Sequence, residues 1–449
     1  MNVLDSELIR SSLSDAGYAW NDDASAADII LFNTCSVRGH AEDKVYSALG
    51  RLRDWKEKSG TVLGVVGCMA QKDAEQIFRR AKHVDLVVGP GRIAALPDLV
   101  GKVLAGETPH LLISEERLGG DPESVLASFE HYDTERHAAA RPSQHQAMVR
   151  VMSGCDNFCS YCVVPRVRGP QKYRPSADIL AEVEQLAKQG CVEVTLIGQT
   201  VNSYLHEGIT LAGLLQSIEK IDGIERIKFV TNYPTDTTTE LIDTVASSKK
   251  CLPYFHIPAQ SGANSMLQRM KRHYTIEQYR EIVEEIREKI PTAAITSDFI
   301  VGFCGETDEE FAATVELVRW ARFKNSFVFK YSERPATLAA GKLADDVPYP
   351  VKQERNNTLL ALQNEICIAE NQRFVGEAVE VFVEGISKNA KKKIEQMPSE
   401  TFDADAPYQL TARTRCDRIV VFDGSLSAIG KILTVNIARA DAQTLFGNL

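Results

Sequence analysis

The stretch SGCDNFCSYCVVPRVRGP, from Ser153 to Pro170, decides how the rest of this chain is interpreted. It places three cysteines, Cys155, Cys159 and Cys162, within eight residues. Thiolates at Cys-x3-Cys-x2-Cys spacing are soft ligands that suit an iron–sulfur cluster, and three of them leave one iron of a four-iron cluster open. A structural zinc site usually needs four ligands, and this loop offers no fourth cysteine or histidine. The alternative interpretation is three buried, inert cysteines.

Strand-like and helix-like segments alternate from the start of this stretch. The strand-like segments are 148–154, 192–199, 226–234, 253–258, 294–303 and 326–335, and the helix-like ones are 178–189, 211–221, 238–248, 275–290 and 308–323. Repeated βα units of this length predict a parallel (βα)6 part-barrel over 147–371, with Ser176 as the cap of its first long helix. Such folds carry out catalysis at the carboxyl ends of their strands, where the cysteine loop falls.

The segment before residue 117 also alternates strands and helices, which predicts a parallel α/β domain over 1–117. Cys35 ends the apolar run ADIILFNTC, and Cys68 ends the run TVLGVVGC. Both thiols are therefore expected at the carboxyl edge of the sheet, where parallel sheets bind their ligands. The polar stretch 118–146 has little periodicity and is expected to be a linker.

Short β-like runs and turn glycines over 372–440 predict a small β-barrel as the last domain. The basic run SKNAKKK, 387–393, lies within it, and Arg413, Arg415 and Arg418 follow shortly after. On its own, such a run is more often a solvated loop than a binding site.

The composition of the whole chain limits the classes of function. The 449 residues are 44% hydrophobic and carry a net charge of −10, so any contact with nucleic acid should be local. No apolar run is long enough to span a membrane, and the N-terminal residues do not form a signal peptide. Ten cysteines without an export signal favour metal or redox chemistry over disulfides. We therefore expect a cytoplasmic chain with no membrane contact.

The cysteine triplet at the first strand of a part-barrel resembles the radical S-adenosylmethionine (SAM) enzymes. The resemblance extends over almost the whole chain through LFNTCSVR, VVGCMAQ, LIGQTVNSY, HIPAQSGANSMLQRMKR, SDFIVGFCGET, FKYSERPATLAA and TRCDRIVVFDG, in that order. Together these segments are similar to the methylthiotransferases. LIGQTVNSY and the closing DAQTLFGNL are most similar to the tRNA branch of that family, the MiaB-like enzymes. The C-terminal segment resembles a TRAM domain, which binds RNA.

The resemblance implies two [4Fe-4S] clusters and SAM as cofactors. Cys155, Cys159 and Cys162 would hold the cluster that binds SAM, and Cys35 and Cys68 would be ligands of an auxiliary cluster. The third auxiliary cysteine of the family lies in a G-C-Q-M-N-x-x-D-S-E stretch, and this chain begins at MNVLDSE, inside that motif. We expect a misplaced start rather than a true loss of this cysteine.

The implied reaction adds a methylthio group to carbon 2 of N(6)-isopentenyladenosine at tRNA position 37, near the anticodon. The alternatives are methylthiolation of threonylcarbamoyladenosine in tRNA or of a ribosomal protein, and a non-catalytic RNA-binding paralogue. The implied partners are tRNA and an electron donor such as flavodoxin or ferredoxin, and we expect a monomer. Next to a TRAM domain, SKNAKKK and the three arginines that follow it are expected to contact phosphates.

Several residues near the predicted active face are candidates for hydrogen bonds to SAM or to the base, with turn capping as the alternative. We expect four of them to bind the cofactor: Gln199, Gln260, Ser261 and Asp298. The others are Asn202 and Arg334.

The remaining candidates are expected to have simpler roles. Phe158 and Tyr161 either shield the cluster or pack, and Glu182 is expected to be an exposed helix residue. Cys304 stands where the family usually has proline, and we expect a small buried thiol there. The same expectation applies to Cys191, Cys251, Cys367 and Cys416.

Overall fold

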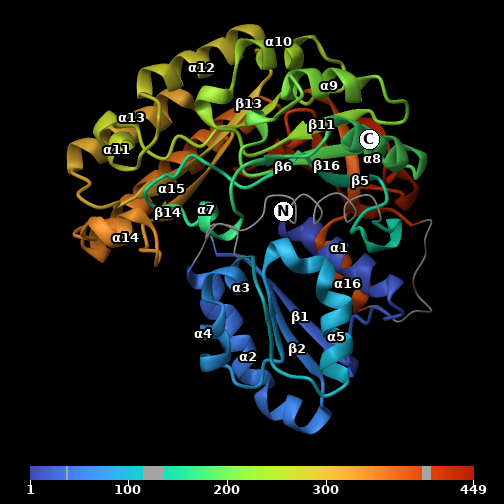
Figure 1. Ribbon diagram of the computed structural model, residues 1–449. Helices are drawn as coiled ribbons and strands as arrows, with labels where there is room; N and C mark the ends of the chain where they lie inside the picture. The colour runs from blue at the N-terminus through green and yellow to red at the C-terminus, as the bar shows by residue number, and fades with distance from the viewer. Residues whose placement is uncertain (37–38, 115–135, 397–405) are drawn as a thin grey trace.

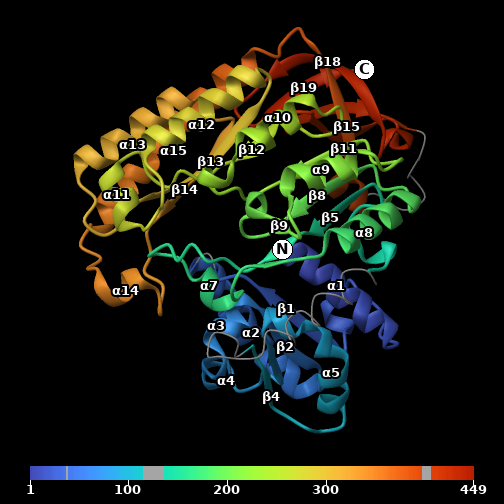
Figure 2. The ribbon, with the colours of Figure 1, turned by 45° about the horizontal axis from the view of Figure 1, so that its top comes forward.

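The computed structural model describes residues 1–36, 39–114, 136–396 and 406–449, which form three parts (Figure 1). The N-terminal α/β unit lies below the larger central unit in that view. In both Figure 1 and Figure 2 the C-terminal strands lie next to the first strands of the central unit. Within the described ranges, no helix is both long and apolar enough to cross a membrane. Most of the predicted linker falls on 115–135, outside the described residues.

A four-stranded parallel sheet forms the centre of the N-terminal unit, as the sequence predicts. Its strands pair in chain order and are β1 (Ile29–Thr34), β2 (Val62–Gly67), β3 (Leu86–Val88) and β4 (His110–Leu112). The helices are α1 (Asn2–Asp15), α2 (Gly39–Ser59), α3 (Cys68–Asp73), α4 (Glu75–Arg80) and α5 (Leu96–Leu104). They cover both faces of the sheet (Figure 1), so β2 is buried along its whole length.

The central unit is a six-stranded part-barrel, which confirms the predicted fold class. Its strands are β5 (Gln146–Arg150), β8 (Glu193–Ile197), β11 (Arg226–Phe229), β12 (Tyr254–His256), β13 (Ala294–Val301) and β14 (Asn325–Lys330). One parallel ladder contains β5, β8 and β11, and a second contains β12, β13 and β14. A backbone bridge between Ile227 and Cys251 joins the two ladders. Two short antiparallel pairs lie beside them: β6 (Met152–Ser153) with β7 (Lys172–Tyr173), and β9 (Leu205–His206) with β10 (Ile209–Thr210).

Helices follow the strands of the part-barrel. They are α7 (Val164–Val167), α8 (Ser176–Lys188), α9 (Leu211–Glu219), α10 (Thr239–Ser247), α11 (Asn264–Arg269), α12 (Ile276–Lys289), α13 (Asp308–Ala321), α14 (Leu338–Lys342) and α15 (Tyr349–Gln372). Thr275 and Thr307 form capping boxes that satisfy the first amides of α12 and α13. The predicted cap at Ser176 is wrong, because this serine is the first helical residue and its side chain makes no capping bond.

Five strands close a small barrel at the C-terminus, as predicted. They are β15 (Ala378–Ile386), β16 (Tyr408–Thr414), β17 (Ile419–Gly424), β18 (Ile432–Ala440) and β19 (Thr444–Asn448), in the order β15-β16-β17-β19-β18. β19 lies past the expected end at 440 and pairs with both β17 and β18. The basic run is not a loop: it forms helix α16 (Lys388–Glu395), whose first turn is capped by the Ser387 hydroxyl.

Candidate active site

The three-cysteine loop runs from β6 to α7, at the carboxyl-terminal side of the part-barrel strands. Gly154 begins the loop with φ 79°, and a Cβ at this position would lie 1.8 Å from the Pro170 carbonyl oxygen. The Gly154 N–H donates to Gln199 Oε1 at 2.7 Å. Further along, the Cys162 N–H donates to the Cys159 carbonyl at 3.0 Å. The loop is therefore a tight turn whose first position requires glycine.

Cys159 lies close enough to Cys155 and Cys162 to affect the ionisation of these two thiols. Burial raises the pKa of Cys155, and the neighbouring Cys159 raises it further. Burial raises the pKa of Cys162 to about 12, and Cys159 is the next cause. Arg272 donates to Cys159 Sγ at 3.5 Å. Thiols with raised pKa values keep their protons at neutral pH, so binding of a metal would release those protons.

The residues between the cysteines differ in what they contact. Phe158 has φ 48° and is 54% exposed, so its ring does not pack into the core. Tyr161 packs edge-on against Phe303, with ring centroids 6.4 Å apart. Ser160 is fully buried, and its hydroxyl donates to the Arg269 carbonyl at 2.8 Å. The serine thus ties the loop to the end of α11.

Cys35 and Cys68 occupy matching positions on neighbouring strands of the N-terminal sheet. Thr34 pairs with Gly67 at the ends of β1 and β2, and each cysteine is the next residue. Burial raises the pKa of Cys68; the Arg168 guanidinium opposes this effect, and Cys35 adds to it. The two thiols therefore lie together at the carboxyl edge of the sheet, where the sequence places them.

The short helix α7 connects the two groups of thiols. Val163 and Val167, at its two ends, pack with Cys68 in one apolar cluster. Arg168 follows α7, and its Nε donates to Cys68 Sγ at 3.2 Å. The same guanidinium pairs with Asp5 of α1 at 2.6 Å. Figure 1 shows α7 between the part-barrel and α3; the three-cysteine loop leads directly into this helix, and Cys68 packs against its ends.

Comparisons with known proteins identify the family. Family models match at 1–89 (uncharacterized protein family UPF0004), 149–318 (radical SAM superfamily) and 403–449 (TRAM domain). A tRNA-2-methylthio-N(6)-dimethylallyladenosine synthase from Rhodopirellula baltica is 50% identical over 455 residues, covering 100% of this chain and 93% of the relative. This chain belongs to that synthase family. The synthase of the same name from Moorella thermoacetica is 39% identical, over 100% of this chain and 96% of its own length.

Solved structures share the fold of this synthase family member. The radical SAM methyltransferase TsrM from Kitasatospora setae, with a tryptophan substrate and the SAM analogue aza-SAM bound, matches with a TM-score of 0.57. The match covers 75% of this chain and 72% of TsrM at 16% identity. At that identity the likeness supports the fold alone.

The radical SAM cofactors fit the residues of the three-cysteine loop. Radical SAM proteins use SAM and a [4Fe-4S] cluster, and three thiols on one loop are the donor set that such a cluster needs. No group of three or more His, Cys, Asp and Glu side chains in the described ranges is arranged around a single metal ion. A cluster does not require that arrangement, because each thiolate binds a different iron. Asp298 Oδ1 is buried without a hydrogen-bond partner in the described structure, as expected of a group that faces a polar ligand.

The auxiliary cluster of the synthase family fits less completely. Cys35 and Cys68 supply two thiols, whereas the resemblance implies three. Cys304 does not complete this set: it is buried with Phe303 and Tyr331 in an apolar cluster of the part-barrel. Burial raises its pKa, as expected of the small buried thiol that the sequence predicts. The other four cysteines predicted to be inert are also buried: Cys191, Cys251, Cys367 and Cys416.

The four residues expected to bind the cofactor differ in their surroundings. The Gln199 carboxamide holds the cysteine loop rather than pointing at a free space. Ser261 is fully buried, and its hydroxyl lies 3.2 Å from Thr314 Oγ1 of α13. The Gln260 N–H donates to the Asp298 carbonyl at 2.8 Å, and Gln260 has φ 67°. Asp298 Oδ2 lies 3.5 Å from His256 Nε2. A direct contact with SAM stays a prediction for all four.

For Asn202, turn capping is the role that the structure supports. Its side chain donates to the Tyr233 carbonyl and accepts from the Tyr233 N–H, both at 2.7 Å. For Arg334, the structure shows a backbone role, because its carbonyl accepts from the Thr337 hydroxyl at 2.8 Å before α14.

Three residues near the site are absent from the sequence-based candidates. Arg168 and Arg272 each donate to a cysteine sulfur. Asn232 follows β11, is 3% exposed, and has neither amide atom paired within the described structure. It follows Thr231, whose φ of 70° is unusual for a β-branched residue. The polar pair directly after the run RIKFV is the signal that marks this position.

The expectation that Glu182 is exposed is wrong. Its side chain is 5% exposed and pairs with Arg174 and, at 3.2 Å, with Arg136. Arg136 also pairs with Glu7 of α1 at 2.9 Å. The residue therefore joins the central unit to the N-terminal helix instead of facing water.

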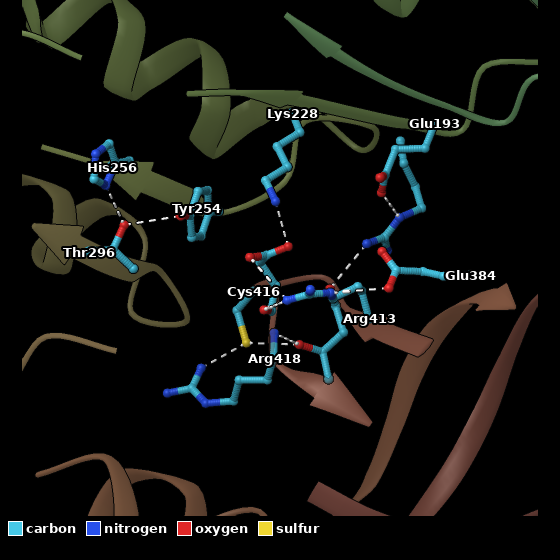
Figure 3. A network of polar contacts seen from close by, with 12 residues as sticks. Glu193, Lys228, Tyr254, His256, Thr296, Glu384, Arg413, Cys416 and Arg418 are labelled. Atoms are coloured by element: carbon cyan, nitrogen blue, oxygen red, sulfur yellow. Dashed lines mark hydrogen bonds and ion pairs between the residues drawn. The ribbon is translucent and has the colours of Figure 1, made fainter. Parts of the chain in front are cut away.

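The three arginines of the C-terminal barrel are also engaged within the molecule, and Figure 3 shows two of them, Arg413 and Arg418. Arg413 pairs with Glu384 at 3.3 Å. Arg415 donates to the Lys249 and Cys251 carbonyls, at 2.7 and 3.1 Å. Arg418 is 9% exposed and donates to Asn371 Oδ1 and Cys416 Sγ, both at 2.9 Å. These guanidinium groups therefore have partners within the protein, which leaves them less available for the expected phosphate contacts.

Proposed function

We propose that this chain adds a methylthio group to carbon 2 of N(6)-isopentenyladenosine at position 37 of tRNA, beside the anticodon. The observation that carries the proposal is the pair of thiol groups at α7, one on the radical SAM loop and one on the N-terminal sheet. The names of relatives at 50% and 39% identity specify this nucleoside, since dimethylallyl is another name for the isopentenyl group. The TRAM match at 403–449 supports an RNA substrate.

The chemistry of the target explains why a radical enzyme is needed. The hydrogen on carbon 2 of adenine is a poor target for ionic chemistry. A [4Fe-4S] cluster held by Cys155, Cys159 and Cys162 would, with SAM and one electron from a donor, supply the radical chemistry that such a hydrogen needs. The protein holds the loop in place through Gly154 and Gln199, and Arg272 fixes Cys159. The target base must leave the anticodon stack to reach the strand ends, as other base-modifying enzymes require.

The partners follow from the same proposal. The exposed lysines of α16 are the side chains best placed to contact tRNA phosphates: Lys388, Lys391, Lys392 and Lys393. A flavodoxin or a ferredoxin would supply the electron. We further propose a monomer that works in the cytoplasm, with the domains divided at 117, 146 and 371.

Nucleoside mass spectrometry of tRNA tests the proposal. The chain would be expressed in cells that lack their own tRNA methylthiotransferase. Methylthio-isopentenyladenosine should appear with the wild-type chain and with Cys304→Ala, and should be absent with Cys159→Ala. If the deficient cells that express the wild-type chain accumulate isopentenyladenosine alone, this target is refuted for the chain. Methylthiolated threonylcarbamoyladenosine or a modified ribosomal protein in the same cells would identify an alternative target.

Iron analysis separates an enzyme from a non-catalytic RNA-binding paralogue. Two [4Fe-4S] clusters correspond to about eight irons per chain, one cluster to about four, and a binding module to none. Cys35→Ala and Cys159→Ala, measured separately, would show which group of thiols holds which iron. A wild-type chain that takes up no iron would refute the enzymatic proposal.

A further inference from the structure

The turn Thr414–Arg418 of the C-terminal barrel lies against the amino-terminal ends of the part-barrel strands (Figure 3). Asp417 lies in this turn, and two lysines of the part-barrel reach its carboxylate. Lys228 Nζ donates to Asp417 Oδ1 at 2.6 Å, and Lys324 Nζ donates to Oδ2 at 3.0 Å. Lys228 belongs to β11, and Lys324 directly precedes β14. A residue of the last domain therefore supplies a negative charge to the end of the part-barrel.

The charged side chains of Lys228, Lys324 and Asp417 are largely shielded from water. The exposed fractions of the side chains are 17% for Lys228, 14% for Lys324 and 11% for Asp417. Burial lowers the pKa of Lys324 to about 8, against the opposing effect of Asp417. Burial acts to raise the pKa of Asp417, but its cationic neighbours outweigh this effect and the pKa lies below its usual range. Among the described residues, neither lysine has another carboxylate within ion-pair distance.

A column of contacts connects these lysines, through Tyr254 and Thr296, to His256; Figure 3 shows Lys228, Tyr254, Thr296 and His256. The ring centre of Tyr254 lies 4.6 Å from Lys228 Nζ and 5.2 Å from Lys324 Nζ. The Tyr254 hydroxyl accepts from Thr296 Oγ1 at 3.1 Å, and Thr296 Oγ1 lies 3.0 Å from His256 Nδ1. His256 in turn lies beside Asp298, whose second oxygen is unpaired in the described structure. The lysines thus lie beneath the face that carries the cysteine loop.

The net charge of this column of residues affects how tightly the site binds a charged cofactor. SAM is a cation because of its sulfonium group, whereas S-adenosylhomocysteine has a neutral thioether at the same atom. From the level of Thr296 to Val301 at the end of β13, five steps of about 3.3 Å give a separation of about 17 Å. At an effective dielectric of about 20, one unit charge at this distance changes the affinity for a cation about five-fold.

We propose that Asp417, contributed by the C-terminal domain, tunes the radical SAM site from a distance: its carboxylate offsets one positive charge of the group formed by Lys228, Lys324 and Arg413 and so favours binding of a cationic cofactor. The residue acts through the charge of the column and touches no reacting atom, so it is a positioning residue. The proposal concerns SAM, the cofactor of the family, and does not depend on which RNA is modified.

The test compares two ligands that differ by one charge. Dissociation constants for SAM and for S-adenosylhomocysteine would be measured by anaerobic calorimetry on the cluster-loaded chain and on Asp417→Asn. Asparagine suits the left-handed backbone of this position, φ 64°, at least as well as aspartate, so the variant changes charge and not backbone strain. We expect SAM affinity to fall about five-fold and S-adenosylhomocysteine affinity to stay unchanged.

Two further variants separate charge from structure. Asp417→Asn combined with Lys228→Met restores the local charge balance and should restore the wild-type ratio of the two affinities, even if the single variant folds poorly. Arg415→Lys weakens the same domain interface without changing its charge, and should leave the ratio unchanged. Thermal unfolding of each metal-free variant records the structural effect. An equal loss of affinity for both ligands, or no loss for SAM, would overturn the proposal.

Discussion

Replacing Arg136 with methionine tests the buried charge cluster that joins α1 to α8. Arg136 donates to Glu7 at 2.9 Å and to Glu182 at 3.2 Å. The exposed fractions of these side chains are 2% for Arg136 and 5% for each glutamate. Glu182 keeps a second partner, Arg174. Glu7 is therefore the carboxylate that loses its cation in the variant.

The unfolding free energy lost in Arg136→Met follows from the protonation of Glu7. Burial raises its pKa, and Arg136 is the largest opposing cause. Without Arg136 we expect the folded chain to hold Glu7 protonated, while the unfolded chain keeps the ordinary value of 4.5. Each pH unit above that value costs about 1.4 kcal/mol of unfolding free energy, so the loss relative to the wild type is at most about 3.4 kcal/mol at pH 7 and about 1.4 kcal/mol at pH 5.5, because Glu7 already has a raised pKa in the wild-type fold. The value at pH 7 agrees with about 3–5 kcal/mol for breaking other buried ion pairs.

The assay is urea unfolding of the metal-free chain, followed by circular dichroism at pH 5.5 and pH 7. The sign is fixed by linkage: the folded variant binds a proton that the unfolded chain has released, so its stability falls as pH rises. We expect the loss caused by Arg136→Met to be larger at pH 7 than at pH 5.5, by up to about 2 kcal/mol. Asp15→Asn is the matched control, because it removes the neighbouring exposed pair with His137 and should cost less than about 1 kcal/mol.

A loss of equal size at the two pH values would refute this reasoning. It would mean that Glu7 stays ionised in the variant, with Arg141 as the cation that replaces Arg136. Arg141 is buried beside Glu7, and its guanidinium nitrogens have no hydrogen-bond partner in the described structure.

Three other variants test the site and the RNA surface. Gly154→Ala should abolish iron uptake at the radical SAM loop, measured by iron analysis, because the added methyl group would collide with the Pro170 carbonyl; a normal iron content would contradict the role given to this turn. Cys304→Ala should leave iron content and tRNA modification unchanged, and a loss of iron would make Cys304 a ligand. Replacing the lysines at 391–393 with glutamine should weaken tRNA binding and lower the salt dependence by about 0.7–0.9 per lost phosphate contact, whereas Arg415→Gln should leave that dependence unchanged.

The positions of the cluster cysteines were predictable because they depend on local patterns. An apolar run that ends in a cysteine places the thiol at the end of a strand, and parallel strands align their ends at one edge. Cys35 and Cys68 follow this rule, as the pairing of the residues before them shows. Repeated βα units likewise predict the part-barrel, because each unit is about as long as one strand and one helix.

The environments of charged side chains were not predictable, because their partners are distant in the sequence. Glu182 has the sequence context of an exposed helix residue, and its burial depends on Arg136 and Arg174. The arginines at 413, 415 and 418 look like a phosphate-binding group until Glu384 and the carbonyl at Cys251 are seen beside them. A charged residue in a sequence shows that a partner is needed, without showing which one.

The junction between β11 and β12 has a mechanical consequence. Where neighbouring strands of a barrel normally share a row of hydrogen bonds, the chain around β11 and β12 is joined by the isolated bridge at Ile227 and Cys251 and by the hydrogen bond from the Asn232 N–H to the His256 carbonyl. Asp417 holds Lys228 on one side of the junction and Lys324 on the other. The C-terminal domain therefore restrains how far the two halves of the part-barrel can separate, and it would stiffen the wall of the site whether or not RNA is bound.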